Sequence, residues 1–152
     1  MIGVYLLSEI AKRCGGELIG DDIEISCFST DTRTMTSGDA FVALKGKNFD
    51  GNDMAVDAAK NGAIAIVVSR EMSANLPMLY VNDSLEALAM ISSITRERSY
   101  AKVIGITGSQ GKTTVKEMVG SILSCVGTTL ITPKNQNNTV GVPLTLLTLT
   151  ES

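Results

Sequence analysis

The residues best suited to chemistry lie in a glycine-rich segment, Gly105–Thr114, which reads Gly-Ile-Thr-Gly-Ser-Gln-Gly-Lys-Thr-Thr. Glycines let the backbone curl so that successive N–H groups face an anion, and a helix beginning there adds the positive end of its dipole. In such a loop Lys112 would bridge the β- and γ-phosphates and the Thr113 hydroxyl would bind Mg²⁺. The segment therefore predicts a nucleoside triphosphate site with Lys112 and Thr113 as its catalytic residues. Its cofactor-binding residues would be Gly108, Ser109, Gln110, Gly111, Lys112, Thr113 and Thr114.

The segment departs from the strict phosphate-loop pattern at one position. The pattern G-x-x-x-x-G-K-[ST] requires glycine where this sequence has Ile106, and only the portion from Gly108 onward is retained. The alternative is a glycine turn followed by an ordinary helix with a surface lysine. A predicted strand before the loop and a predicted helix after it favour the phosphate site.

The elements around this loop form a single β-loop-α-β unit. A strand is expected at Lys102–Thr107, a helix from Lys112 through Leu123, and a short strand at Thr129–Thr132. A parallel sheet covered by helices needs several strands, and one unit with a short tail cannot bury both faces. We therefore expect this P-loop domain to be incomplete in the chain, which we interpret as the N-terminal part of a longer protein.

The preceding residues alternate between helical and strand patterns, which predicts an α/β domain with a parallel or mixed sheet. Asp83 and Ser84 are candidate caps for its last helix. The polar segment Arg96–Lys102 suggests a boundary, giving domains at 1–100 and 101–152. Strands are expected at 17–19, 23–28, 40–44, 63–68 and 77–81, and helices near 6–11, 54–59 and 85–98.

Composition excludes several classes of function. The 152 residues carry a net charge of -3, which argues against a nucleic-acid binder. There is no histidine, and the three cysteines form no C-x-x-C pair, so a zinc site is not expected. No signal peptide or membrane-spanning stretch is recognisable, which predicts a cytoplasmic protein without a membrane partner.

Several longer motifs resemble the Mur ligases, the ATP-dependent amide-forming enzymes of peptidoglycan precursor synthesis. The likeness runs from about residue 6 to the last residue and is greatest for the branch that uses D-alanyl-D-alanine. The motifs that carry it are the loop Gly108–Thr114, the N-terminal segments Thr30–Arg33, Gly38–Gly46 and Phe49–Gly51, and the stretch Asn135–Leu147.

The resemblance implies a function for each predicted domain. Residues 1–100 would bind UDP-N-acetylmuramoyl-tripeptide, and residues 101–152 would begin the central domain that holds ATP and Mg²⁺. In the family reaction, ATP phosphorylates the substrate carboxylate and the amine of D-alanyl-D-alanine attacks the acyl phosphate. A monomeric parent enzyme without nucleic-acid partners is expected, and the 152-residue chain alone is expected to be inactive.

Substrate-binding residues also follow from the resemblance. Arg33 and the neighbouring hydroxyls suit a diphosphate, and the segment after Lys45 offers a cation and small residues. Chemistry alone favours the simpler interpretation, in which Asp31 and Arg33 form a surface pair and Asp50-Gly51 is a turn, and the two asparagines could likewise be turn formers. The resemblance reverses that preference. The implied set is Thr30, Asp31, Thr32, Arg33, Lys45, Gly46, Asp50, Gly51, Asn137 and Asn138.

One departure and two alternatives remain open. Asn52 stands where this branch commonly has histidine, so the role of that position is undecided. The related ligase that adds the third amino acid is an alternative enzyme, and a non-catalytic UDP-sugar-binding module is an alternative of another class. A GTPase or small kinase is less favoured, since the chain ends before any base-recognition or lid segment.

Overall fold

A five-stranded mixed sheet forms the centre of the N-terminal region in the computed structural model, which describes residues 2–133 and 136–150. Its strand order is β2-β7-β6-β5-β4. Strands β4 (Phe28–Ser29), β5 (Ala40–Val42), β6 (Ala65–Val68) and β7 (Met78–Tyr80) are parallel, and β2 (Glu17–Ile19) joins the β7 edge antiparallel. The predicted α/β class with a mixed sheet is confirmed.

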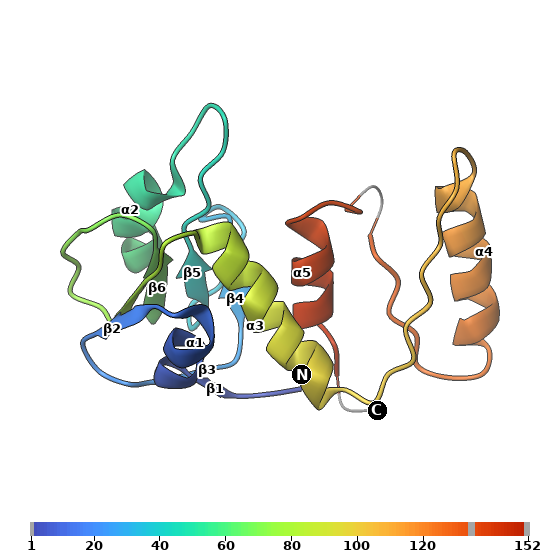
Figure 1. The fold of residues 1–152 in the computed structure, drawn as a ribbon, viewed down its shortest axis with the longest axis horizontal. Coiled ribbons are helices and arrows are strands. Elements are labelled where there is room, and N and C mark those ends of the chain that lie inside the picture. The colour runs from blue at the N-terminus through green and yellow to red at the C-terminus, as the bar shows by residue number, and fades with distance from the viewer. Residues whose placement is uncertain (1, 134–135, 151–152) are drawn as a thin grey trace.

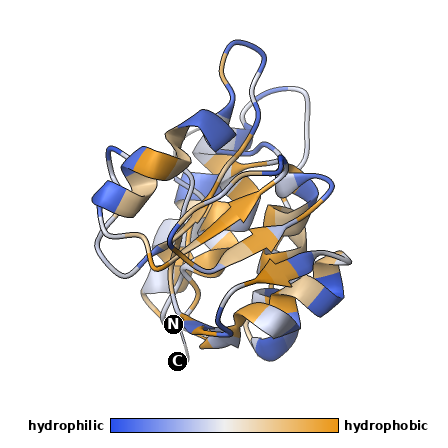
Figure 2. Ribbon diagram, turned by 90° about the vertical axis from the view of Figure 1, so that its left-hand side faces the viewer, coloured by the Kyte–Doolittle hydropathy of each residue, from blue (hydrophilic) through white to orange (hydrophobic). Residues whose placement is uncertain are grey.

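Alternate residues of these strands face two hydrophobic layers. Val42 and Val67 face α1 (Leu7–Cys14) and α3 (Ser84–Arg98), whereas Phe41 and Ile66 face α2 (Ala55–Lys60). Figure 2 shows the hydrophobic residues concentrated along the sheet. Because both faces are covered, every residue of β6 is buried, as its uninterrupted apolar run predicted.

The strand predicted at 23–28 divides into two pieces. Residues Glu24–Ile25 form β3, which pairs antiparallel with β1 (Tyr5–Leu6) in a separate two-stranded sheet. Phe28–Ser29 form β4, which pairs with β5 in the main sheet. The chain crosses between sheets at this point, and a continuous β pattern in sequence does not reveal such a crossing.

Helix ends follow the predicted signals with one difference. Gly15 adopts φ 62°, and its N–H returns to the Ala11 carbonyl at the end of α1. Asp83 caps α3 by accepting hydrogen bonds from the N–H groups of Leu85 and Glu86. Ser84, the other predicted cap, is the first residue of α3, and its buried Oγ has no hydrogen-bond partner among the described residues.

The glycine-rich loop leads into α4 (Lys112–Ser124), which begins at the predicted residue. The strands predicted at 102–107 and 129–132 do not form, although both segments run beside α4 in Figure 1. Lys116 Nζ donates to the Thr132 carbonyl at 2.5 Å, which fastens the second segment to the helix. A strand is defined by its ladder of hydrogen bonds, and neither segment has a neighbouring strand in the described residues.

A short helix that was not predicted, α5 (Gly141–Leu147), returns to the N-terminal region. It packs on α3, and Leu144 and Leu147 join the hydrophobic core there. Farther on, the Ile2 N–H donates to the Leu149 carbonyl at 3.1 Å. The two ends of the described chain therefore meet beside α3, while α4 stands apart from the sheet (Figure 1). No helix within 2–133 or 136–150 has the length and apolar content needed to cross a bilayer.

Candidate functional site

The backbone of the glycine-rich loop turns sharply where α4 begins. Gly111, the residue before the helix, has φ 75° and ψ -1°, a left-handed conformation that favours glycine. Among the described residues, no side chain caps α4, so N–H groups of its first turn have no side-chain acceptor there. Residues 107–115 are exposed. The loop therefore presents open backbone donors together with the positive end of a 13-residue helix.

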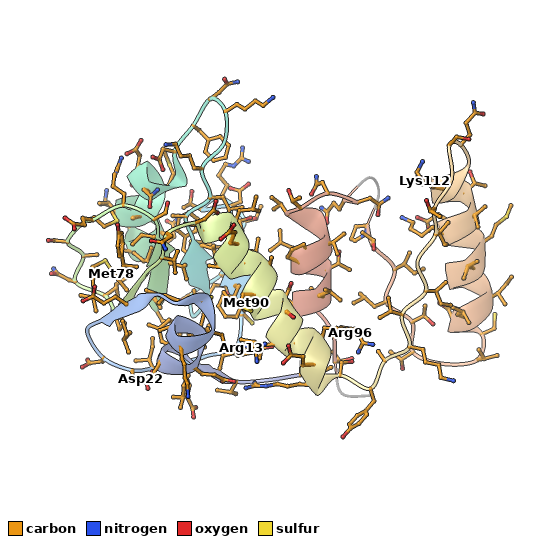
Figure 3. The ribbon with its side chains drawn as sticks, viewed as in Figure 1. Arg13, Asp22, Met78, Met90, Arg96 and Lys112 are labelled. Atoms are coloured by element: carbon orange, nitrogen blue, oxygen red, sulfur yellow. The ribbon has the colours of Figure 1, made fainter. Side chains whose placement is uncertain are left out.

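Lys112 folds back over this loop. Its Nζ donates to the Gly108 carbonyl at 2.5 Å, so the ammonium lies above the turn that would hold an anion. Figure 3 shows Lys112 at the upper end of α4. Thr113 and Thr114, the next two residues of α4, are exposed. Ammonium, hydroxyl and N–H donors in one loop match the chemistry of a polyphosphate.

A divalent cation at this loop would need ligands besides Thr113. The described residues hold no group of three or more histidine, cysteine, aspartate or glutamate side chains arranged around a common point. Mg²⁺ commonly uses one or two protein ligands together with phosphate oxygens and water. The donor set around Thr113 fits that mode of binding.

The Thr30–Arg33 segment is a turn closed by its own charges. The Arg33 guanidinium donates to both Asp31 carboxylate oxygens, at 2.9 and 2.6 Å, and the Arg33 N–H donates to Oδ1 at 3.0 Å. These bonds hold the pKa of Asp31 at about 2. Asn61 also donates to the Thr32 carbonyl at 2.8 Å. The surface pair that chemistry alone suggested is thus present in the structure, and the Arg33 side chain is 85% exposed.

The Lys45–Gly51 loop is a tight, hairpin-like turn. The backbones of Lys45 and Asp50 pair in an isolated antiparallel β-bridge. The N–H groups of Gly46 and Gly51 donate to the carbonyls of Phe49 and Leu44, each at 2.9 Å. A Cβ on Gly51 would lie 2.5 Å from the Leu44 oxygen. This glycine is therefore required for close backbone approach, whatever its part in binding. The Lys45 side chain stays exposed.

Three residues that sequence reasoning did not select hold this loop. Asn52 bonds to Asp50 of the loop and to Ser69, which directly follows β6. Arg70, the next residue, pairs with Asp50. In the sequence, Asn52 stood out only as a departure from the family pattern, and Ser69 and Arg70 only as a polar pair directly after a buried apolar run, a feature common to many strand ends. Their contacts depend on strand order, which local patterns do not specify.

The two asparagines after α4 have different surroundings. Asn138 Oδ1 accepts hydrogen bonds from the N–H groups of Val140 and Gly141, at 3.1 and 2.7 Å, and so caps the start of α5. The side chain of Asn137 is exposed. The first asparagine of the motif, Asn135, lies outside the described residues.

Strand topology brings the two N-terminal loops together. The Thr30–Arg33 turn follows β4 and the Lys45–Gly51 loop follows β5, and the carboxyl ends of parallel strands lie at one edge of a sheet. The hydrogen bonds and ion pairs described for these two loops all join residues of the N-terminal region. The structure thus contains two candidate surfaces: a sheet edge with Arg33 and Lys45, and the N-terminus of α4.

Comparison with known proteins gives consistent matches. Residues 24–119 match the Mur ligase family, catalytic domain, and residues 106–152 match the Mur ligase middle domain. The UDP-N-acetylmuramoyl-tripeptide–D-alanyl-D-alanine ligase of Escherichia coli is 47% identical over 99% of this chain and 33% of its own length. A Bacillus subtilis ligase of the same name is 33% identical over 96% of this chain. The chain thus spans about a third of the length of these relatives.

Solved structures agree with these matches. A MurF crystal structure from Acinetobacter baumannii covers 97% of this chain and 34% of its own, with a TM-score of 0.89 and 39% identity. The MurF ligase of Thermotoga maritima, solved in complex with ADP, covers 80% of this chain and 28% of its own, with a TM-score of 0.74 and 36% identity.

Proposed function

Because this chain belongs to the Mur ligase family, we propose that it provides the UDP-substrate domain and the first ATP-binding unit of a D-alanyl-D-alanine-adding ligase. The parent enzyme would join D-alanyl-D-alanine to UDP-N-acetylmuramoyl-tripeptide through an acyl phosphate. The observation that carries this proposal is the 47% identity, over 99% of the chain, to a ligase of that name. The open N-terminus of α4 supplies the matching chemistry.

In this proposal, residues 1–100 form the domain that binds the UDP-linked substrate, and residues 101–152 begin the domain that binds ATP. Because α5 packs on α3, the second segment would remain attached to the first through that contact. We further propose a cytoplasmic, monomeric enzyme without nucleic-acid or membrane partners. The net charge of -3 supports the absence of nucleic acid.

Bound ATP with Mg²⁺ would supply the phosphoryl group. Lys112 would exchange its bond to the Gly108 carbonyl for phosphate oxygens, and Thr113 would provide a hydroxyl ligand for the metal. The backbone N–H groups from Gly108 to Thr114, with those of Ser109 and Gln110 among them, would donate to the remaining phosphate oxygens. Charge neutralisation at the transferred group would then be the main contribution of these residues to the rate.

The UDP-linked substrate would lie along the sheet edge. Arg33 and Lys45 would provide its cations, with the hydroxyls of Thr30 and Thr32 as further donors. Asp31 would orient Arg33, and Asp50 would hold the loop of Gly46 and Gly51 in shape. Asn138 already caps α5 through its oxygen, which leaves its amide nitrogen and the Asn137 side chain to orient the substrate's reacting end.

Replacing Lys112 in the longer ligase tests the ATP assignment. Lys112→Ala should lower ATP-dependent turnover roughly hundredfold or more, since loss of one preorganised charge donor has effects of that order. The affinity for UDP-N-acetylmuramoyl-tripeptide should remain within about twofold. Lys102→Ala, which removes an exposed lysine outside the loop, is the matched control. Unchanged phosphate release by the Lys112 variant would refute the assignment.

The alternative enzyme adds the third amino acid. The diaminopimelate-adding ligase of Bacillus licheniformis is 37% identical, but over only 70% of this chain and 22% of its own length. The longer and closer match favours the D-alanyl-D-alanine branch. Turnover with D-alanyl-D-alanine, but not with diaminopimelate or lysine, is expected of the longer enzyme.

A non-catalytic UDP-sugar-binding module is the alternative for the 152 residues by themselves. The exposed loop and the unformed strands beside α4 support it, because a P-loop sheet supports its loop from several strands. Calorimetry with the UDP-muramoyl peptide, followed by Mg-ATP, separates the two. Binding of the first ligand without the second would assign the isolated chain as such a module.

A further inference from the structure

Asn52 is the most deeply enclosed polar side chain near the sheet edge. It is 1% exposed and lies in the short 3-10 helix η1 (Gly51–Met54). Its Nδ2 donates to Asp50 Oδ1 at 2.6 Å and to Ser69 Oγ at 3.3 Å. Its Oδ1 accepts the Ser69 N–H at 3.0 Å. Both amide hydrogens and one oxygen lone pair are therefore engaged within the protein.

These bonds join two segments that are distant in sequence. Asp50 belongs to the Lys45–Gly51 loop after β5, and Ser69 directly follows β6. Arg70 adds an outer connection, with its guanidinium 2.7 Å from the Asp53 carboxylate and 3.7 Å from that of Asp50. Asn52 is thus the inner link, and Arg70 the outer link, between the loop and the end of β6.

The charge on Asp50 strengthens the inner link. Hydrogen bonds from the Asn52 side chain and backbone are the main reason that the pKa of Asp50 is lowered, with smaller contributions from Arg70 and Lys45. Asp50 is therefore ionised at neutral pH, and the 2.6 Å bond from Asn52 is charge-assisted. Bonds of this kind are about twice as strong as bonds between neutral groups.

The loop is open at the end opposite this link. Phe49 is 62% exposed and Lys47 is exposed, and the Lys45 side chain, at the base of the loop, is exposed as well. A loop fixed at its base and open at its tip can present its cations without reordering when a ligand binds, which lowers the entropy lost on binding. The network around Asn52 supplies the fixed base.

We propose that Asn52 is a positioning residue for the UDP-linked substrate, which it serves by fastening the Lys45–Gly51 loop to the carboxyl end of β6. The inference rests on the proposed function of that loop. Asn52 itself is too enclosed to touch the substrate, and its donors already have partners. Its effect reaches the ligand through Asp50 and the loop backbone.

The first test needs no ligand and measures the loop itself. In Asn52→Ala, the amides of Gly46 and Gly51, which bond within the loop and to Leu44, should exchange with solvent at least about tenfold faster. Amides in β5 and β6 should keep their protection. Asn82→Ala, at an exposed asparagine, is the matched control. Unchanged exchange at both glycines would overturn the positioning role, whatever the substrate proves to be.

The second test measures binding and uses a variant of the same shape. Asn52→Asp places a second carboxylate against Asp50 in place of the amide donor. In the longer ligase, both variants should raise KM for the UDP-linked substrate at least about tenfold at pH 8, with little change in kcat or in KM for ATP. Asn82→Ala should behave as wild type. An equal fall in kcat, with KM unchanged, would contradict the proposal.

Lowering the pH separates hydrogen bonding from packing. Two adjacent carboxyl groups share a proton at a raised pKa, so Asn52→Asp should regain binding as the pH falls from about 8 toward 5, while Asn52→Ala should not. Arg70, Asp53 and Lys45 are the other charged groups around this pair, and they are the same in both variants. No recovery in the aspartate variant would show that packing alone matters at position 52 and would overturn the proposal.

Two controls keep these outcomes separable. If Asn52→Ala does not fold, Arg70→Gln removes the outer link at a half-exposed position and should raise the same KM by a smaller factor. If the wild-type protein does not bind the UDP-linked substrate, the proposed function fails, yet the exchange test still decides the role of Asn52. If the wild type binds it and no variant weakens binding, the positioning role fails alone.

Discussion

Helices α3 and α4 have similar lengths, 15 and 13 residues, but very different surroundings. Helix α3 packs against the main sheet, α1 and α5, and Asp83 caps its first turn. In α4 only Gly120 is buried, and within the described part of the chain no side chain caps the helix. Tertiary packing supplies most helix stability in proteins, so the two helices should differ sharply in how firmly they are held.

The sequence of α4 nevertheless has the pattern of a packed helix. Val115, Met118 and Ile122 recur at helical spacing and are 46%, 60% and 67% exposed. Such a stripe normally faces a core. The segments beside it, at 102–107 and 129–132, form no sheet in the described residues. The comparison shows that an apolar stripe specifies a buried face only where a second layer is available to cover it.

Hydrogen exchange should show the largest difference between the two helices. Amides in the middle of α4 should exchange roughly a thousandfold faster than those in the middle of α3, because α4 opens locally while α3 opens with the whole region. Amide exchange followed by NMR measures both at once. Equal protection would show that α4 is held as firmly as α3 and would remove the contrast.

Matched truncations should show the next largest effect. Leu88→Ala in α3 removes a fully buried side chain and should lower the free energy of unfolding by about 2–5 kcal/mol. Ile122→Ala in α4 removes a mostly exposed one and should change it by less than about 0.5 kcal/mol. Urea unfolding measures both. A large loss for Ile122→Ala would mean that this face is covered in solution.

The helix starts should give a smaller difference. Asp83→Ala removes the cap of α3 and should lower the free energy of unfolding by about 1 kcal/mol. Gly111→Ala places a side chain at φ 75° before α4, a strain of about 1–2 kcal/mol. If α4 unfolds separately, only the first variant should shift the urea midpoint of the main transition. A shift for both would show that the two helices unfold together.

How far the sequence predicted the structure depends on the range of the interactions. The start of α4 at Lys112 and the end of α1 at Gly15 followed from local glycine signals, and the buried strand β6 followed from its apolar run. Helix α5 was not predicted because Gly141, Val142, Pro143 and Thr145 give it weak helical propensity, which its packing on α3 overrides.

The candidate site was predicted unevenly for the same reason. Short motifs indicated the loops that contain Arg33, Lys45 and Lys112. The link from Asn52 to Ser69 was not predictable, because it requires β5 and β6 to be neighbours in the sheet. Local patterns identify exposed loops with charged residues more readily than the residues that hold such a loop in place.

The smallest expected effect is a shift in the pKa of Asp31. It tests whether the cations of the two candidate surfaces, Arg33 and Lys112, have different partners. Arg33 is held by a carboxylate, whereas Lys112 is held by a backbone carbonyl. Because the folded pKa of Asp31 is about 2, below an unfolded value of about 3.9, its contribution to stability is complete above the unfolded value. That contribution is lost as the pH falls through about 2.

Carbon NMR of the Asp31 carboxyl group should therefore show a midpoint near 2, and Arg33→Ala should return it toward the ordinary range. Lys112→Ala should leave this midpoint unchanged, since Lys112 bonds to Gly108 instead. If Arg33→Ala also leaves it unchanged, the pair does not persist in solution. Arg33 would then have no carboxylate partner before a ligand binds, as is the case for Lys112 at the start of α4. The difference between the two surfaces would disappear.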